Sequence, residues 1–127
     1  MRAATGYREY MINGAHLVIH SRDAEADRVF LRDVLGWPHV DAGGGWLIFK
    51  LPPAEIAVHP GGSPSHELFL MCDDVDATVR ELAARGVEVL GPVEERRFGR
   101  LARIRVPGAG ELTVYEPSHP TAIGLQR

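Results

Sequence analysis

The sequence nearly repeats itself at an interval of 50 residues. Three pairs of identical residues share this spacing: His16 and His66, Asp23 and Asp73, Gly36 and Gly86. The ends of the two halves also correspond, because residues 55–60 (Glu-Ile-Ala-Val-His-Pro) resemble residues 111–117 (Glu-Leu-Thr-Val-Tyr-Glu-Pro). A chain that folds one unit twice tends to place equivalent residues around a pseudo-twofold axis. The repeat therefore predicts two like modules whose matched histidines lie near a common centre.

Each half has the pattern of one βαβββ module. Residues 12–20 alternate apolar and polar side chains, which is typical of a half-buried strand. Asp23 is expected to cap a helix that ends at Gly36, because aspartate accepts bonds from unpaired N–H groups and glycine tolerates the left-handed C-cap. The second half repeats this order, from a strand at 66–72 to a helix that ends at Gly86. The remaining predicted strands are 37–40, 46–51 and 54–59 in the first half, and 87–93, 101–106 and 111–116 in the second.

These elements divide the chain into segments. We expect an N-terminal extension at 1–11, a first module at 12–60, a linker at 61–65, a second module at 66–117 and a C-terminal tail at 118–127. One helix per module covers only one face of its strands, so the other face must form a cavity or contact a partner. The expected fold class is therefore α+β, with a curved, mixed eight-stranded sheet around one pocket and helices on its outer face.

Alternation along the strands sorts their side chains into two sets. The helix-facing set is Leu17, Ile19, Leu47, Phe49, Ile56, Val58, Phe69, Met71, Ile104, Val106, Leu112 and Val114. The opposite set is rich in titratable groups: His16, His20, Lys50, Glu55, His59, His66, Arg103, Arg105, Glu111, Thr113 and Tyr115. A concave face with so many polar groups predicts a pocket lined by them.

Composition excludes several classes of protein. The net charge of −3 argues against a nucleic-acid partner, which requires a basic surface. The single cysteine, Cys72, excludes an internal disulfide and a Cys-rich zinc site, which fits a cytoplasmic location. No apolar run approaches the roughly 20 residues that cross a bilayer, and the first ten residues lack the apolar stretch of a signal peptide. We therefore expect no membrane association.

The doubled module resembles the vicinal-oxygen-chelate superfamily, which includes glyoxalase I, extradiol dioxygenases, fosfomycin-resistance enzymes and bleomycin-binding proteins. Residues 14–19 (Gly-Ala-His-Leu-Val-Ile) look like its opening strand. Residues 65–76 look like the opening of its second module, and residues 107–117 look like its closing turn and strand. The resemblance spans 12–117 and extends to a small actinobacterial subgroup labelled glyoxalase or dioxygenase. It implies a homodimer, as is common for members of this size.

The resemblance also implies where a divalent metal (Fe, Zn, Ni or Mn) would bind. The opening ligands of metal-using members match His16 and His66, whereas the closing ligands fall at Ala57 and Thr113. Alanine cannot bind a metal and threonine binds these metals poorly. Other groups lie two residues from those positions on the same strand faces: Glu55, Glu111, His59 and Tyr115. Alternatively, the two histidines are pocket residues that hold no metal, because two ligands are too few for tight binding.

Five residues are the candidate lining of the ligand pocket: Trp46, His59, Arg103, Thr113 and Tyr115. Trp46 would stack on a flat ligand, and His59 would add a third imidazole or stand partly exposed at a strand end. Arg103 would fix an anionic substrate through its paired donors, or belong to a solvated strand edge. Tyr115 would donate a proton or hydrogen bond to a ligand oxygen, or serve only as a wall residue.

Two functions follow from these expectations. The first is a protein of this superfamily that binds a small organic molecule in the inter-module pocket with little or no metal. The alternative is a divalent-metal-dependent lyase or dioxygenase that uses His16 and His66, with the metal as Lewis acid. The sequence identifies neither a catalytic residue nor a substrate. A dimeric protein–protein module with a vestigial pocket is a third interpretation.

Overall fold

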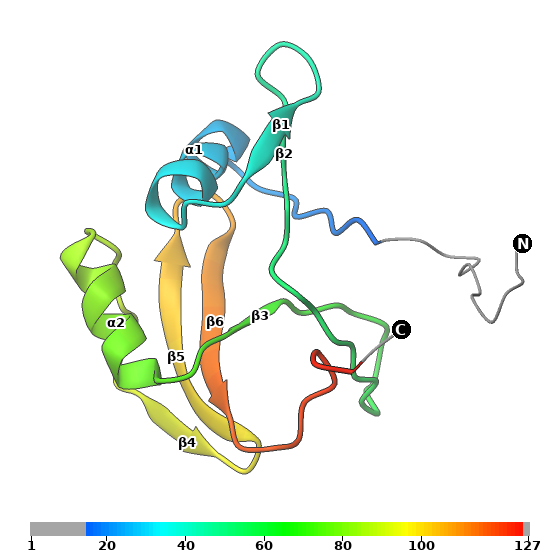
Figure 1. Ribbon diagram of the computed structural model, residues 1–127, viewed down its shortest axis with the longest axis vertical. Helices are drawn as coiled ribbons and strands as arrows, with labels where there is room; N and C mark the ends of the chain where they lie inside the picture. The colour runs from blue at the N-terminus through cyan, green and yellow to red at the C-terminus, as the bar shows by residue number, and fades with distance from the viewer. Residues whose placement is uncertain (1–14, 126–127) are drawn as a thin grey trace, which may run out of the picture.

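A four-stranded mixed sheet forms the centre of the molecule in the computed structural model, which describes residues 15–125. Its strands are β3 (Phe69–Met71), β4 (Glu94–Arg96), β5 (Gly99–Val106) and β6 (Gly110–Pro117), and their spatial order is β3-β6-β5-β4 (Figure 1). β5 and β6 form a long antiparallel hairpin, while β3 runs parallel to β6 with Leu70 opposite Val114. β3 is therefore an edge strand, and no strand of this sheet pairs with the backbone groups on its outer side.

Helix α2 (Val75–Ala84) covers one face of this sheet. Its start is capped because the Asp74 carboxylate accepts a hydrogen bond of 3.1 Å from the backbone N–H of Ala77. Its end is followed by Gly86, whose φ of 88° is the left-handed conformation that favours glycine. The apolar side of the helix faces β5 and β6, where Leu82 packs against Ile104 and Val114.

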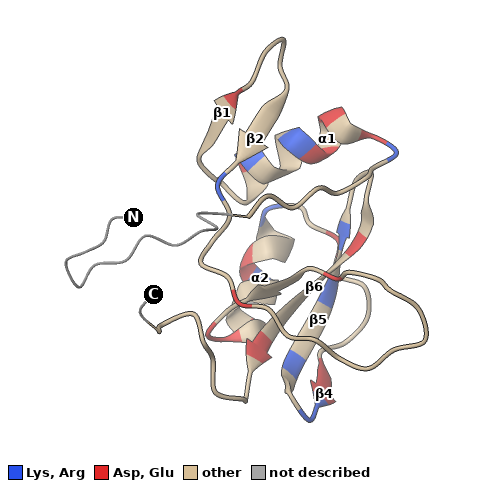
Figure 2. Cartoon of the chain, turned by 90° about the vertical axis from the view of Figure 1, so that its right-hand side faces the viewer, with Lys and Arg blue, Asp and Glu red and all other residues tan. Residues whose placement is uncertain are grey.

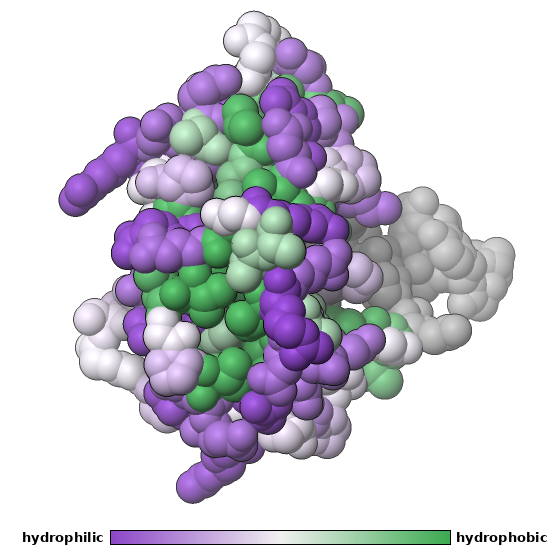
Figure 3. Space-filling view, turned by 90° about the vertical axis from the view of Figure 1, so that its left-hand side faces the viewer, coloured by the Kyte–Doolittle hydropathy of each residue, from purple (hydrophilic) through white to green (hydrophobic). Residues whose placement is uncertain are grey.

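The first half of the chain adds a second helical segment to the same core. α1 (Ala24–Val29) is capped by Asp23 and continues into a π-helical turn, η1 (Phe30–Val34). Phe30 is buried against α2 and the sheet. A hydrogen bond of 2.6 Å from Arg85 Nη1 to the Val34 carbonyl links this segment to the end of α2. The two helices thus share one apolar core. Viewed from that side, hydrophobic residues gather in a band between hydrophilic ones (Figure 3).

A small hairpin stands apart from the main sheet. β1 (His39–Asp41) and β2 (Leu47–Phe49) pair antiparallel, and Gly43, Gly44 and Gly45 turn the chain between them (Figure 1). The Asp41 carboxylate holds this turn, because Oδ1 accepts a bond of 2.7 Å from the N–H of Gly43. The hairpin and the central sheet are separate sheets among residues 15–125.

A close backbone approach ties the two halves together at Gly108. The Gly108 N–H donates to Asp27 Oδ1 at 2.7 Å, and the Gly108 carbonyl accepts from the Arg22 N–H at 3.3 Å. A Cβ on Gly108 would lie 2.6 Å from the Asp23 nitrogen and closer still to the Ser21 hydroxyl. Glycine is therefore required at this contact between the β5–β6 turn and the start of α1.

Several strand predictions for the first half are wrong. Residues 15–20 and 54–59 lie in no strand, and their apolar side chains are largely exposed; Ile56 and Val58 are each 91 % exposed. Prolines flank the second of these segments on both sides and supply no N–H for a ladder. In the second half, the strand predicted at 87–93 is reduced to a single bridge between Val89 and Ile104. The rest of the strand predicted at 12–20 lies outside the described residues.

Side-chain alternation was predicted correctly on the long strands and incorrectly on β3. Ile104, Val106 and Val114 face the helices, as expected, and are almost fully buried. On β3, however, Leu70 and Cys72 pack against the helical core. Phe69 and Met71 therefore point to the other face, because successive side chains in a strand alternate. The prediction was one residue out of register there, which reverses every side chain of the strand. Leu17, Ile19, Ile56 and Val58 were also expected against the helices and are exposed instead.

Within residues 15–125, no helix has the length and apolar character that crossing a membrane requires.

Candidate functional site

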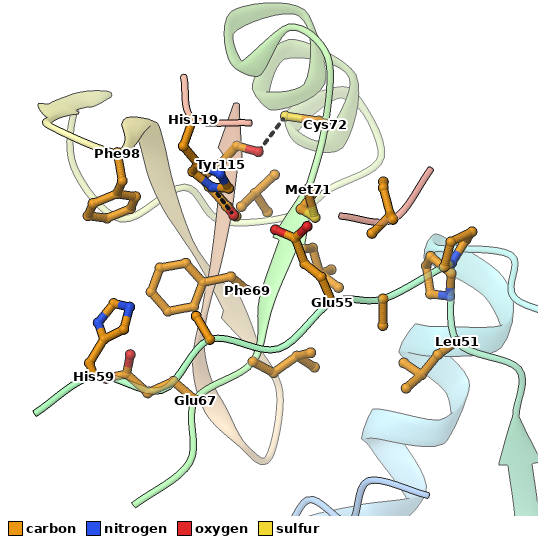
Figure 4. A pocket seen from close by; sticks show the side chains of 18 of the residues that line it. Leu51, Glu55, His59, Glu67, Phe69, Met71, Cys72, Phe98, Tyr115 and His119 are labelled. Atoms are coloured by element: carbon orange, nitrogen blue, oxygen red, sulfur yellow. Dashed lines mark hydrogen bonds between the residues drawn. The ribbon is translucent and has the colours of Figure 1, made fainter. Parts of the chain in front are cut away.

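A cavity of about 1390 Å³ lies along the free edge of β3. Its walls come from β3, from the extended segment 51–65 that leads to it, from the end of β6 and the residues after it, and from residues of α2 and Trp37. Most lining residues are apolar. Among the polar ones, Glu55 and His119 lie near Tyr115, whereas His59 and Glu67 lie apart from it (Figure 4). The labelled residues of this wall are Leu51, Glu55, His59, Glu67, Phe69, Met71, Cys72, Phe98, Tyr115 and His119.

Three aromatic rings form one cluster on the wall of the cavity. Phe69 from β3 meets Tyr115 from β6 edge to face, with ring centroids 5.6 Å apart. Phe98, in the turn before β5, lies 5.8 Å from Tyr115 and 6.2 Å from Phe69. The register of the sheet brings Phe69 and Tyr115 to the same face. Phe69 pairs with Thr113, and Tyr115 lies two residues further along β6, where the side chain points to the same side as that of Thr113. Such a cluster offers broad, rigid apolar surface to a ligand.

Tyr115 and His119 form an oriented hydrogen-bonded pair. The Tyr115 hydroxyl lies 3.1 Å from His119 Nε2, and His119 Nδ1 lies 2.7 Å from the Pro120 carbonyl oxygen. A carbonyl oxygen can only accept, so Nδ1 carries a proton and Nε2 of the neutral ring is the acceptor. The Tyr115 hydroxyl therefore donates to His119, and its lone pairs remain available to the cavity.

Glu55 connects the extended segment to the C-terminal residues. Its Oε1 accepts a hydrogen bond of 2.6 Å from the Ala122 N–H, and its carboxylate is turned toward the Tyr115–His119 pair (Figure 4). Burial raises the pKa of the Tyr115 phenol, and the negative charge of Glu55 raises it further. Tyr115 consequently stays protonated beyond its ordinary titration range, as a group that donates to His119 must.

Cys72 contributes a thiol of low reactivity to the cavity. Its Sγ donates a weak hydrogen bond to the Tyr115 carbonyl at 3.6 Å. Burial raises the pKa of the Cys72 thiol, and the nearby Glu116 carboxylate adds to this effect. The thiolate needed for nucleophilic attack is therefore disfavoured, and Cys72 serves as a small apolar residue of the wall.

Several solved structures share this arrangement of elements. TnmS3, an antibiotic binding protein from Streptomyces sp. CB03234, is 26 % identical to this chain with a TM-score of 0.61, and the match covers 87 % of this chain and all of TnmS3. A superfamily member from Sphaerobacter thermophilus is 23 % identical with a TM-score of 0.55, covering 84 % and 99 % of the two chains. Lactoylglutathione lyase from Agrobacterium tumefaciens is 19 % identical with a TM-score of 0.54, covering 84 % and 96 %.

The chain has the fold of the glyoxalase/bleomycin resistance protein/dioxygenase superfamily. No protein-family model and no curated protein matches it by sequence. This is the vicinal-oxygen-chelate fold, so the resemblance stated from the sequence motifs is confirmed at the level of the fold. The likeness to structures below 25 % identity concerns the fold, and the site must be judged from its own residues.

The structure divides the five candidate pocket residues into two groups. Tyr115 and His59 line the cavity, His59 from the extended segment and Tyr115 from β6. Arg103 lies instead on the sheet surface between Glu111, at 3.3 Å, and Glu94, at 3.5 Å. Figure 2 shows such basic residues of β5 beside acidic ones of the neighbouring strands. Thr113, opposite Arg103 in register, is not among the lining residues, and Trp46 is 63 % exposed beneath the Arg28 guanidinium.

The two repeated histidines do not form a metal centre with other donors in the part of the chain that the structure describes. His16 and His66 are exposed and lie outside the cavity lining. Among residues 15–125, no group of three or more His, Cys, Asp or Glu side chains is placed to hold one ion. A catalytic metal needs about three protein ligands. The arrangement of donors therefore does not fit the metal site that the superfamily resemblance implies.

Sequence reasoning missed four residues that shape the cavity. Phe69 and Met71 were expected against the helices, and Phe98 carried no assignment. His119 lies beyond the second module, in the segment read as a tail. One signal was present: His119 comes just after the last strand and precedes a proline, which restricts its backbone.

Proposed function

We propose that this protein binds a planar small organic molecule in the cavity beside β3. The observation that carries the proposal is the cluster of Phe69, Phe98 and Tyr115 on the wall of a largely apolar cavity. A concave apolar site with a few convergent polar groups is the usual construction of a small-molecule site. The structural similarity to TnmS3, an antibiotic binding protein, supports binding as the primary activity.

Trp37 provides a direct test, because it lines the cavity while Trp46 does not. The chain has two tryptophans, so Trp46→Phe leaves Trp37 as the sole fluorescent reporter. Planar polycyclic compounds are expected to change its emission in a saturable manner and to raise the melting temperature of the protein. Phe49→Ala, on the separate hairpin, is the control variant that should leave binding unchanged. Saturable binding that Phe69→Ala and Phe98→Ala leave intact would contradict the assigned site.

The metal-dependent lyase or dioxygenase stays a prediction from the resemblance. It requires His16 and His66 to come together with at least one further ligand, an arrangement that the described residues do not have. Metal analysis of untagged protein, followed by His66→Ala, tests it. A stoichiometric divalent metal that is lost on this substitution would favour the enzyme over the binder. The cytoplasmic location likewise stays a prediction.

We also propose that two copies associate and thereby complete the eight-stranded curved sheet. Two observations support this: Ile56 and Val58 are each 91 % exposed, and β3 is an edge strand. Exposed apolar residues on an extended segment and an unpaired strand edge both favour pairing with another chain. Strand formation by residues 15–20 and 54–59 would add the two strands that the first module lacks, because the second module already has β3–β6.

The oligomeric state is measured by light scattering after size-exclusion chromatography. We expect twice the chain mass of 13.9 kDa. The double variant Ile56→Asp/Val58→Asp is expected to be a monomer, whereas Val40→Asp, which places a charge at another exposed apolar position, should remain a dimer. A wild-type protein that stays monomeric at high concentration would refute this association without affecting the cavity.

A further inference from the structure

All fully charged side chains of the cavity have the same sign. Among the described residues that line it, Glu55 and Glu67 are acidic, and none is lysine or arginine. The arginines of β5 are engaged elsewhere, for example Arg105 with Glu88 at 3.0 Å. An anionic ligand would enter a partly desolvated space that already holds two carboxylates and no fixed counter-charge. The charge of the cavity therefore favours a cation.

The hydrogen-bonding groups at the centre of the cavity are acceptors. The Tyr115 hydroxyl donates its hydrogen bond to His119 Nε2, so its oxygen lone pairs are available to accept a hydrogen bond from a ligand. Glu55 uses Oε1 to accept from the Ala122 N–H, and its Oε2 accepts no bond from any residue in 15–125. Two neighbouring acceptor oxygens, one of them charged, match a cationic N–H donor.

The aromatic wall favours the same kind of ligand. Phe69, Phe98 and Tyr115 form a cluster on one side of this region (Figure 4), and the face of each ring is electronegative. A cation next to aromatic faces gains attraction beyond the burial of apolar area. Flat ring systems fit the same cluster by offset or edge-to-face contact.

We propose that the ligand is a planar aromatic cation with a protonated ring nitrogen, whose N–H lies between the Glu55 carboxylate and the Tyr115 hydroxyl oxygen. This assignment rests on the proposed binding function and adds the charge and polarity of the ligand. Glu55 is the specificity-determining residue, because it supplies the counter-charge, and His119 is a positioning residue that sets the direction of the Tyr115 hydroxyl.

The test uses acridines, which share one flat ring system and differ in charge. At mildly alkaline pH, 9-aminoacridine is a cation, acridine is neutral and acridine-9-carboxylate is an anion. Titration of the full chain, with calorimetry and Trp37 emission as readouts, should show the cation binding about tenfold or more tightly than the anion, as a charge-assisted hydrogen bond implies. Glu55→Gln keeps an oxygen for the Ala122 N–H but removes the charge. It should weaken the cation about tenfold and change acridine binding by less than about twofold.

Glu25→Gln is the matched control, since it removes the same charge from an exposed position on α1, and it should alter none of the affinities. An anion that binds as tightly as the cation would overturn the assignment of ligand charge and leave the proposed binding function intact. The same holds if Glu55→Gln, with an unchanged melting temperature, retains the full preference for the cation. Failure of all three acridines to bind would overturn the aromatic-binding function itself.

Discussion

The Tyr115 hydroxyl donates a hydrogen bond to His119 Nε2 at 3.1 Å, and the Pro120 carbonyl fixes the tautomer of that imidazole. This pair joins the last strand to the residues that follow it and orients the Tyr115 phenol in the cavity wall. Because the donor proton is committed to His119, the polar centre of the cavity is defined by acceptor oxygens.

Glu55→Gln should lower the pKa of Tyr115. Burial and the Glu55 charge both raise this pKa, so removing the charge lowers it while burial keeps it above the ordinary value of about 10. The measurement is an alkaline titration of phenolate absorbance. Subtracting the titration of Tyr115→Phe removes the signal of Tyr7 and Tyr10. A Tyr115 pKa that rises or stays constant in Glu55→Gln would show that the carboxylate does not act on the phenol.

Stability should fall at alkaline pH because of the same residue. Tyr115 has a folded-state pKa above its unfolded value, so its contribution to stability is complete below about pH 10 and is lost as the pH rises through the folded pKa. Melting temperatures measured from neutral pH upward should therefore decline more steeply for wild type than for Tyr115→Phe. Parallel curves for the two proteins would contradict the linkage.

Phe98→Ala should weaken binding of a planar ligand about tenfold, because an aromatic contact of this type contributes roughly 0.5–1.5 kcal/mol beyond apolar burial. Phe98 is 38 % exposed, so the loss of fold stability should be small. Fluorescence titration in the Trp46→Phe background measures the affinity, and Phe49→Ala serves as the comparison. Equal affinities in the two variants would remove Phe98 from the site.

Ile104→Ala should destabilise the fold by about 2–5 kcal/mol, as expected for a large-to-small change in a packed core. Ile104 is fully buried between the sheet and the helices. Urea denaturation gives the free energy of unfolding. Leu125→Ala, at a position that is 74 % exposed, should change it by less than about 0.5 kcal/mol. Similar values for both variants would mean that the core is not centred on Ile104.

Gly108→Ala should lower the melting temperature because the new Cβ would collide with the Asp23 backbone, 2.6 Å away, and with Ser21. The two hydrogen bonds that join Gly108 to Arg22 and Asp27 would be disturbed as well. Gly62→Ala is the control, since a Cβ at Gly62 meets no atom within 4 Å. A melting temperature equal to that of Gly62→Ala would show that the two halves do not meet at Gly108.

Local signals in the sequence predicted the second module well. Asp74 and Gly86 bound α2 as capping rules require, and Ile104 and Val114 face the helices as strand alternation requires. These features depend on neighbours within a few residues, so local propensity and periodicity are sufficient to predict them.

The first module was predicted less well, because strands need partners. Residues 15–20 and 54–59 alternate apolar and polar side chains as strands do, but they lie in no strand. Alternation predicts which face of a strand would be buried, but it does not predict whether another strand is available to pair with it. The face of Phe69 was also mispredicted, because a short edge strand of three residues carries too little pattern to fix its register.

By itself, the sequence determined the superfamily fold, the order of elements in the second half and the helix boundaries, because caps, glycines and periodicity act locally. Only the tertiary structure decided the composition of the cavity. It brings Glu55, Phe69, Tyr115 and His119 together from four separate segments, and it leaves His16 and His66 outside the cavity lining. Such convergence depends on strand register and on how segments cross, which no spacing along the chain specifies.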